Sequence, residues 1–85
     1  MNKKYYIVIR ECGFNPNVIG CFKTKEDAEN FAKMNIYSYK KELSDVGAYN
    51  FDIYESALMM SYSGLIPQNS KTYTFWHIKE LEITE

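Results

Sequence analysis

The chemistry available to this chain is limited first by its histidine content. His77 is the only histidine, and it follows Trp76 in a stretch rich in aromatic and β-branched residues. Nucleophilic catalysis needs a base within hydrogen-bond reach of the nucleophile and a third group that orients the base. Zinc and similar ions need three or four convergent ligands. A lone histidine in a predicted strand meets neither requirement, so we expect His77 to be structural.

The two cysteines, Cys12 and Cys21, give no redox or metal motif. Their spacing matches neither CxxC nor a zinc pattern. Free cysteine is among the most frequently buried residue types. We therefore expect two buried free thiols on neighbouring strands, and no metal site.

Carboxylates and glycines give no catalytic or cofactor signal either. Most of the acidic residues lie beside lysines or at the expected helix and chain ends, where solvation or the helix dipole accounts for them. The glycines are scattered and form no phosphate-binding loop; they are Gly13, Gly20, Gly47 and Gly64. We therefore expect no enzyme activity and no cofactor.

Length and charge restrict the classes of partner. The 85 residues suit a single domain, residues 1–85. Ten basic and eleven acidic residues alternate, so a net charge of −1 offers no field that would attract nucleic acid or an anionic membrane. Residues 1–4 lead into Tyr5 and Tyr6 without a signal-peptide core. We expect a cytoplasmic protein that binds neither nucleic acid nor membrane.

The first half of the chain predicts a β-hairpin followed by a helix. Residues 4–12 are β-branched and aromatic with almost no interruption, which is typical of a central strand. Residues 13–17 have hairpin-loop chemistry, and residues 18–23 return as a second strand. Thr24 is the expected N-cap, and Gly47 is the expected stop. The helical stripe that should pack on the sheet is Ala28, Phe31, Ala32, Asn35 or Ile36, Tyr39 and Leu43.

The second half predicts further strands. Residues 49–54 alternate, and residues 73–83 are rich in strand-forming types. The stretch from Glu55 to Tyr62 could be a strand extension or a short helix, and we favour one long strand. Residues 63–71 should form a loop. The resulting fold class is α+β, an antiparallel sheet of about four strands with one helix packed on one face (ββαββ).

Large side chains outnumber the core positions that one helix and one sheet provide. They cannot all point inward if alternation holds; the residues concerned are Tyr37, Tyr54, Met59, Met60, Tyr62 and Trp76. Aromatic residues and methionine are enriched at the centres of protein interfaces. The alternative is that they extend the core or form a homodimer interface. The candidate binding residues are Tyr54, Met59, Tyr62, Leu65, Ile66 and Trp76.

Residues 5–9 and 18–32 follow the pattern "YYvV…viGvFsTkeeAe.fa", with Tyr5-Tyr6-Ile7-Val8-Ile9 and then Val18-Ile19-Gly20-Cys21-Phe22-Lys23-Thr24. In this half the chain resembles small accessory proteins of phages and mobile elements. The resemblance implies a factor that occupies a host protein or captures a host signalling molecule, and it carries over no site residue.

Two functions follow as expectations. The first is a non-enzymatic, phage-type accessory protein in the host cytoplasm that binds and inhibits a host protein; a component of antiviral defence is one form of this function. The second is a homo-oligomeric sponge that sequesters a nucleotide-like signalling molecule between subunits. In the sponge, Tyr or Trp would stack on the base, and Lys or Arg10 would bind phosphate.

Overall fold

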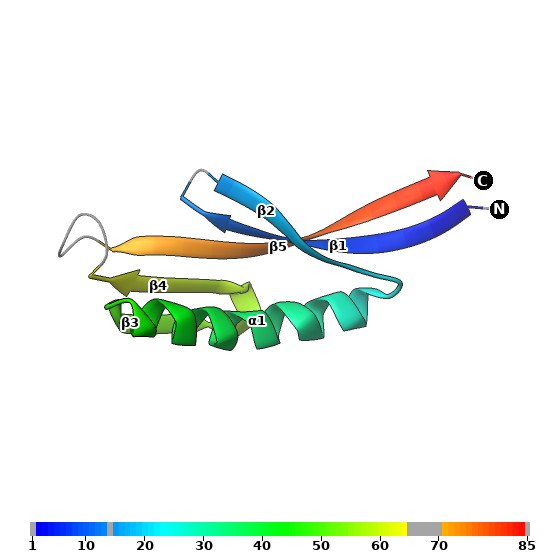
Figure 1. The fold of residues 1–85 in the computed structure, drawn as a ribbon. Helices are drawn as coiled ribbons and strands as arrows, with labels where there is room; N and C mark the ends of the chain where they lie inside the picture. The colour runs from blue at the N-terminus through cyan, green and yellow to red at the C-terminus, as the bar shows by residue number, and fades with distance from the viewer. Residues whose placement is uncertain (1, 14, 65–70, 85) are drawn as a thin grey trace.

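The computed structural model describes residues 2–13, 15–64 and 71–84 as a sheet and one long helix (Figure 1). None of the helices in these ranges is long and apolar enough to span a membrane. The elements in chain order are β1 (Asn2–Cys12), β2 (Asn15–Phe22), α1 (Lys25–Asp45), β3 (Tyr49–Tyr54), the 3-10 turn η1 (Glu55–Ala57), β4 (Met59–Ser63) and β5 (Thr72–Thr84).

The sheet has five strands in the order β2-β1-β5-β4-β3, and every neighbouring pair is antiparallel. β1 pairs with β5 along the whole length of β1, from Asn2 opposite Thr84 to Cys12 opposite Thr74. The expected α+β class with one helix on an antiparallel sheet is confirmed. The expected number of about four strands is close to the observed five.

The additional strand arises because the stretch from Tyr49 to Ser63 folds back on itself. β3 and β4 pair as a hairpin, with Tyr54 opposite Met59. Between them, Leu58 adopts a left-handed conformation with φ 51°. The expectation of one long strand through Glu55 to Tyr62 is therefore wrong. The physical reason is that folding back brings Ile53 and Met60 opposite each other, so that both pack against the core.

Helix α1 begins and ends where the sequence predicts. The Thr24 side chain accepts a hydrogen bond from the Asp27 backbone N–H at 3.1 Å, which caps the first turn. The helix is followed by Gly47 at φ +104°, a conformation that other residues rarely adopt. Its buried residues recur every four or seven positions and pack on the sheet; they are Ala28, Ala32, Ile36 and Leu43.

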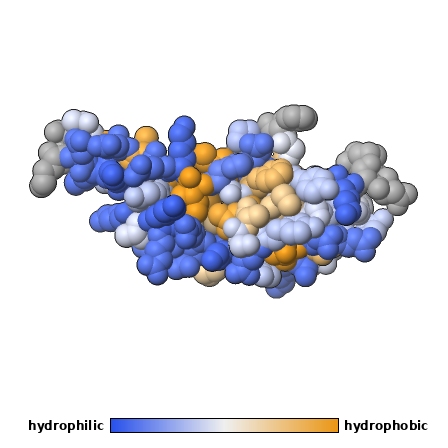
Figure 2. All heavy atoms as spheres, turned by 180° about the vertical axis from the view of Figure 1, so that it is seen from behind, coloured by the Kyte–Doolittle hydropathy of each residue, from blue (hydrophilic) through white to orange (hydrophobic). Residues whose placement is uncertain are grey.

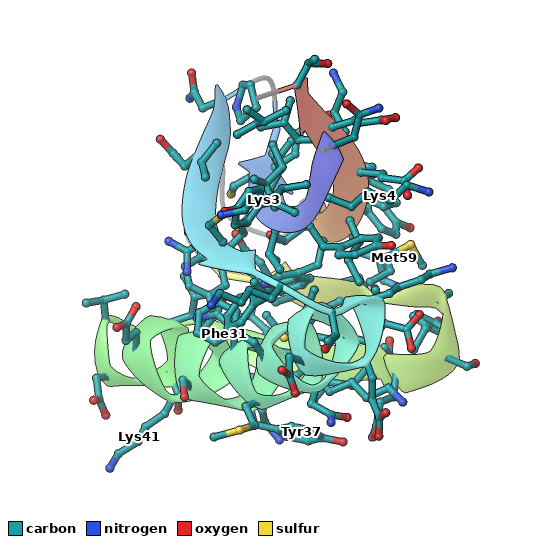
Figure 3. All side chains as sticks on the ribbon, turned by 90° about the vertical axis from the view of Figure 1, so that its right-hand side faces the viewer. Lys3, Lys4, Phe31, Tyr37, Lys41 and Met59 are labelled. Carbon is teal, nitrogen blue, oxygen red and sulfur yellow. The ribbon has the colours of Figure 1, made fainter. Side chains whose placement is uncertain are left out.

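The core lies between this helix and one face of the sheet. Phe31 points from α1 toward β2, whereas Tyr37 and Lys41 point away from the sheet (Figure 3). The Tyr37 hydroxyl donates to Glu55 at 2.9 Å and so connects the helix to η1. The sheet contributes Val8, Met60, Tyr62 and Trp76 to the core, each at most 3% exposed.

One end of the sheet continues beyond the helix. β1 and β5 run past the first turn of α1 toward the two termini (Figure 1), and the molecule measures 51 × 21 × 19 Å. β2 pairs with β1 only from Tyr6 onward. Residues 2–5 and 81–84 therefore form a two-stranded ribbon, which we call the arm.

Candidate binding face

The two faces of the sheet differ in what covers them. Along β5, buried Trp76 lies between Phe75 and His77, which are exposed. Along β1, fully buried Val8 lies between Ile7 and Ile9. Because successive strand residues point to opposite faces, one set faces α1 and the other faces away. We call the second set the open face, since none of the described helices or strands packs on it.

The open face combines residues from all five strands and is largely apolar. Val18 is 64% exposed, Tyr73 45%, Phe75 37%, Leu81 43% and Ile83 44%. Figure 2 shows apolar side chains gathered across the middle of the side turned away from the viewer in Figure 1. Monomeric soluble proteins rarely leave contiguous apolar patches larger than a few hundred Å² exposed. Other residues on this face are Lys3, Tyr5, Ile7, Ile9, Glu11, Cys21, Asp52, Tyr54, Met59, Ser61, His77 and Lys79.

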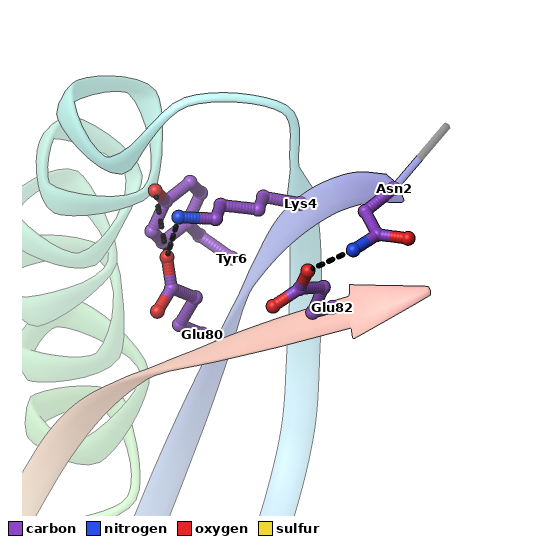
Figure 4. Close-up of polar contacts among 5 residues, drawn as sticks. All are labelled: Asn2, Lys4, Tyr6, Glu80 and Glu82. Carbon is purple, nitrogen blue, oxygen red and sulfur yellow. Dashed lines mark hydrogen bonds and ion pairs between the residues drawn. The ribbon is translucent and has the colours of Figure 1, made fainter. Parts of the chain in front are cut away.

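The arm shows that this apolar character is not a continuation of the core. On its helix side the arm is polar, with a hydrogen bond from Asn2 to Glu82 at 2.6 Å and an ion pair between Lys4 and Glu80 at 3.5 Å (Figure 4). Its open face carries Tyr5, Leu81 and Ile83 instead. The side chains therefore become polar where the helix no longer covers them, whereas the opposite face keeps three large apolar side chains beside Lys3.

The predicted binding residues divide between the two faces. Tyr54 is 47% exposed and Met59 is half-buried, and both lie on the open face. In Figure 3, Met59 lies on the side of β4 away from the helix. Tyr62 and Trp76 are buried against α1, so their burial removes them from any contact surface. Leu65 and Ile66 lie outside the described residues.

Trp76 belongs to a polar network within the core. The Asn35 side-chain oxygen accepts hydrogen bonds from the Trp76 ring N–H at 2.9 Å and from Arg10 at 3.2 Å. The Arg10 guanidinium also lies 4.1 Å from the centre of the Tyr39 ring. These contacts give the buried Trp76 ring N–H and the Asn35 side-chain oxygen their hydrogen-bond partners. Arg10, which the sponge hypothesis offered to phosphate, is engaged with Asn35 and Tyr39.

Cys12 lies at the edge of the same core, half-buried and free. Its sulfur is 3.3 Å from the Tyr62 hydroxyl. Burial acts to raise the pKa of the Cys12 thiol, but the hydroxyls of Tyr62, Thr74 and Tyr39 and the charge of Arg10 together hold this pKa below its usual value. Burial and the Cys12 sulfur raise the pKa of both Tyr39 and Tyr62.

Cys21 does not have the environment that the sequence suggested, and His77 lies on the same face. Cys21 is exposed and lies opposite Ile7 on the open face, so the expectation that both thiols are buried is wrong for this one. His77 is exposed as well, with its ring stacked on Phe75 and its Nε2 3.8 Å from a Glu11 carboxylate oxygen. Alternation along β1, β2 and β5 places the side chains of Glu11, Cys21, Phe75 and His77 on the open face of the sheet.

The described residues offer little that could support catalysis. They contain no group of three or more side chains that could hold a metal ion. A hollow of about 220 Å³ lies between the start of α1 and strands β1 and β5, lined by Tyr6, Lys25, Ile78 and Glu80. Small-molecule sites usually enclose roughly 300–1,000 Å³. The open face is therefore the strongest candidate site.

The sequence contained a signal for the open-face residues of β5 that were not among the predicted binding residues. Phe75, Leu81 and Ile83 share one parity of β5, whereas Trp76 and Ile78 share the other, so both faces of this strand are apolar. A single helix can cover only one of them. Applying alternation to residues 73–83 would have identified an uncovered apolar stripe.

The geometry of the open face is the basis for assigning it as the candidate site. It is apolar, it extends onto the arm, and the helix covers the other side of the sheet. Comparison with protein-family models, curated proteins and solved structures gives no match for this chain.

Proposed function

We propose that this chain is a non-enzymatic protein-binding module that docks on a host protein through the open face and inhibits it in the host cytoplasm. The observation that carries the proposal is the apolar open face, which continues onto the arm where the opposite side is polar. Burial of apolar surface is the main driving force for most protein association. The phage-type pattern of residues 5–9 and 18–32 motivates the choice of a host protein.

The chemistry of the face suits a protein contact. Tyr54, Met59, Tyr73 and Phe75 lie on three neighbouring strands at the end of the sheet opposite the arm. Large, stiff aromatic side chains supply much contact area for little lost conformational entropy. His77 and Glu11 add polar groups that can fix orientation. Inhibition would follow from covering a functional surface of the host protein.

The test compares wild type with a variant of the open face. Phe75→Glu places a charge in the middle of the stripe, and Met34→Glu is the matched control because Met34 is 71% exposed on α1, outside the open face. Tagged full-length chains are used to capture proteins from a host extract. The captured protein is then purified, and its Kd for each chain is measured along with the effect on its activity.

We expect Phe75→Glu to weaken host-protein binding at least about tenfold, because a charge at the interface centre must be desolvated. Met34→Glu should bind as wild type does, and circular dichroism should show that both variants are folded. Equal binding by wild type and Phe75→Glu would contradict the proposed surface. A wild-type chain that captures no specific host protein would contradict the proposed function.

A further inference from the structure

We infer that the open face also binds a second copy of this chain, with two copies packed face to face and turned end for end. Because it uses the same surface, the dimer rests on the proposed function of the open face in protein binding. In this arrangement the arm of each copy covers Tyr73 and Phe75 of the other. The host protein would replace one copy, so the dimer is the form of the chain when its partner is absent.

The arm provides the first reason for a partner that covers the full length of the face. An isolated two-stranded ribbon is marginally stable in water, and packing on a further layer is what stabilises it. The arm is such a ribbon, and its apolar residues Tyr5, Leu81 and Ile83 all face one way. A partner confined to the other end of the sheet would leave these residues exposed. A second copy carries an apolar strip of the same length.

The area of the face is sufficient for a stable dimer. An aromatic side chain buries roughly 150–250 Å², so a large side chain that is about half exposed can contribute roughly 100 Å² more. Val18, Tyr73, Phe75, Leu81 and Ile83 are each between 37% and 64% exposed. Together with half-buried neighbours such as Tyr5, Ile7 and Ile9, they approach the roughly 800 Å² per partner of a standard interface.

The positions of the charges favour the end-for-end orientation. Lys79 is opposite Ile7 on the side nearer the arm, whereas His77 is opposite Ile9, and its ring lies 3.8 Å from Glu11. A twofold axis crossing β5 at the level of Ile78 would bring Lys79 over the partner's His77 and within reach of the partner's Glu11. Packing with the strands of the two copies parallel would instead bring Lys79 near the partner's Lys79, which places like charges together.

The same axis also brings apolar residues of one copy over apolar residues of the other. It places Leu81 over the partner's Phe75 and Ile83 over the partner's Tyr73, because these pairs are equally spaced about Ile78 along β5. Two sheets in such contact pack roughly 10 Å apart with their strands within about 30° of each other. The contact is isologous and closed, so it ends at two copies. The result is a two-layer sheet core with one helix on each outer side.

Sedimentation equilibrium on the full-length chain tests the dimer, and a charge exchange tests its orientation. We expect the mass to rise with concentration from 10.0 kDa toward twice that value. Lys79→Glu and Glu11→Lys should each weaken the dimer at least about tenfold, since each places like charges together. The double variant should recover most of the wild-type affinity. Lys41→Glu, on the outer side of α1, is the matched control and should leave the dimer unchanged.

A wild-type chain that stays at the monomer mass up to the highest soluble concentration would overturn the inference. A dimer that is weakened by Lys79→Glu but not recovered by the double variant would overturn the end-for-end orientation. The proposed function is tested separately, through the host protein. If the chain stays monomeric but its binding to the host protein depends on Phe75, the dimer is wrong and the proposed function stands. If the dimer responds to the charge variants but no host protein binds, the proposed function is wrong and the dimer stands.

Discussion

Asn35 is the acceptor on which two core donors depend. Its side-chain oxygen receives hydrogen bonds from the Trp76 ring and from Arg10. Removing it would leave both donors without this partner, and an unsatisfied buried donor costs roughly 1–3 kcal/mol. The network thus fixes the side chain of Trp76 and holds α1 against β1 and β5.

We expect Asn35→Ala to lower the free energy of unfolding by about 1–3 kcal/mol relative to Asn30→Ala. Asn30 is exposed on the same helix, so it is the matched control. Both changes bring the same gain in helix propensity, of several tenths of a kcal/mol. Urea denaturation of the two variants measures the difference. Equal midpoints would show that the Asn35 hydrogen bonds add no net stability.

Tyr39 and Tyr62 give the stability a pH dependence in the alkaline range. Burial and the Cys12 sulfur raise the pKa of both phenols in the folded chain, whereas an unfolded tyrosine ionises near pH 10. Above that pH the unfolded chain binds fewer protons than the folded chain, so the free energy of unfolding falls as pH rises.

The measurement is urea unfolding between about pH 9 and about pH 11.5. We expect the free energy of unfolding to decrease steadily across this window in wild type. Tyr39→Phe, which removes one of the phenols with a raised pKa, should have a shallower decrease. Parallel curves for the two proteins would contradict a raised pKa for Tyr39.

At the scale of the elements, the end of α1 depends on one backbone conformation. Gly47 has φ +104°, and a Cβ placed there would meet nothing within 4 Å. The consequence of a substitution is therefore backbone strain rather than a clash. Its position between α1 and β3 sets the direction in which the chain turns into the last part of the sheet.

We expect Gly47→Ala to lower the free energy of unfolding by about 1–2 kcal/mol, the usual cost of a left-handed conformation in a residue with a side chain. Gly47→Asn should lose less, since asparagine tolerates such conformations better. Thermal and urea denaturation of both variants check the order. A Gly47→Ala variant as stable as wild type would refute the strain argument.

Local signals in the sequence were sufficient for most of the elements. Thr24, the buried stripe of α1 and Gly47 mark the helix, and strand-forming residues mark β1 and β5. The β3–β4 hairpin was missed because its turn uses Leu58 in a left-handed conformation, where neither glycine nor proline gives a turn signal. The partner of Trp76 could not be inferred because Asn35 is 41 positions away.

For the whole molecule, the difficulty was to decide which face of the sheet is covered. Alternation separates Trp76 from Phe75, but both residues are aromatic, and the sequence does not specify which one meets the helix. Tyr62 and Trp76 were therefore assigned to the binding surface although they belong to the core. Tyr54 and Met59, which were assigned to the same surface, do lie on the open face. Deciding between faces requires knowing how a helix 21 residues long lies on the sheet.

The central claim is that the open face is covered by another protein chain, and Cys21 provides a direct measurement of it. Cys21 is an exposed thiol opposite Ile7, at the level of Lys79 near the proposed axis. Cys12 points to the helix side and serves as an internal reference. The alkylation rate of each thiol can be followed by mass spectrometry at increasing concentrations of the full-length chain, and again with the host protein present.

We expect alkylation of Cys21 to slow as the chain concentration rises and to slow further when the host protein is added, because both partners cover the open face. Cys12 should react at the same rate throughout. A Cys21 rate that stays constant across the concentration series and is unaffected by the host protein would contradict the account.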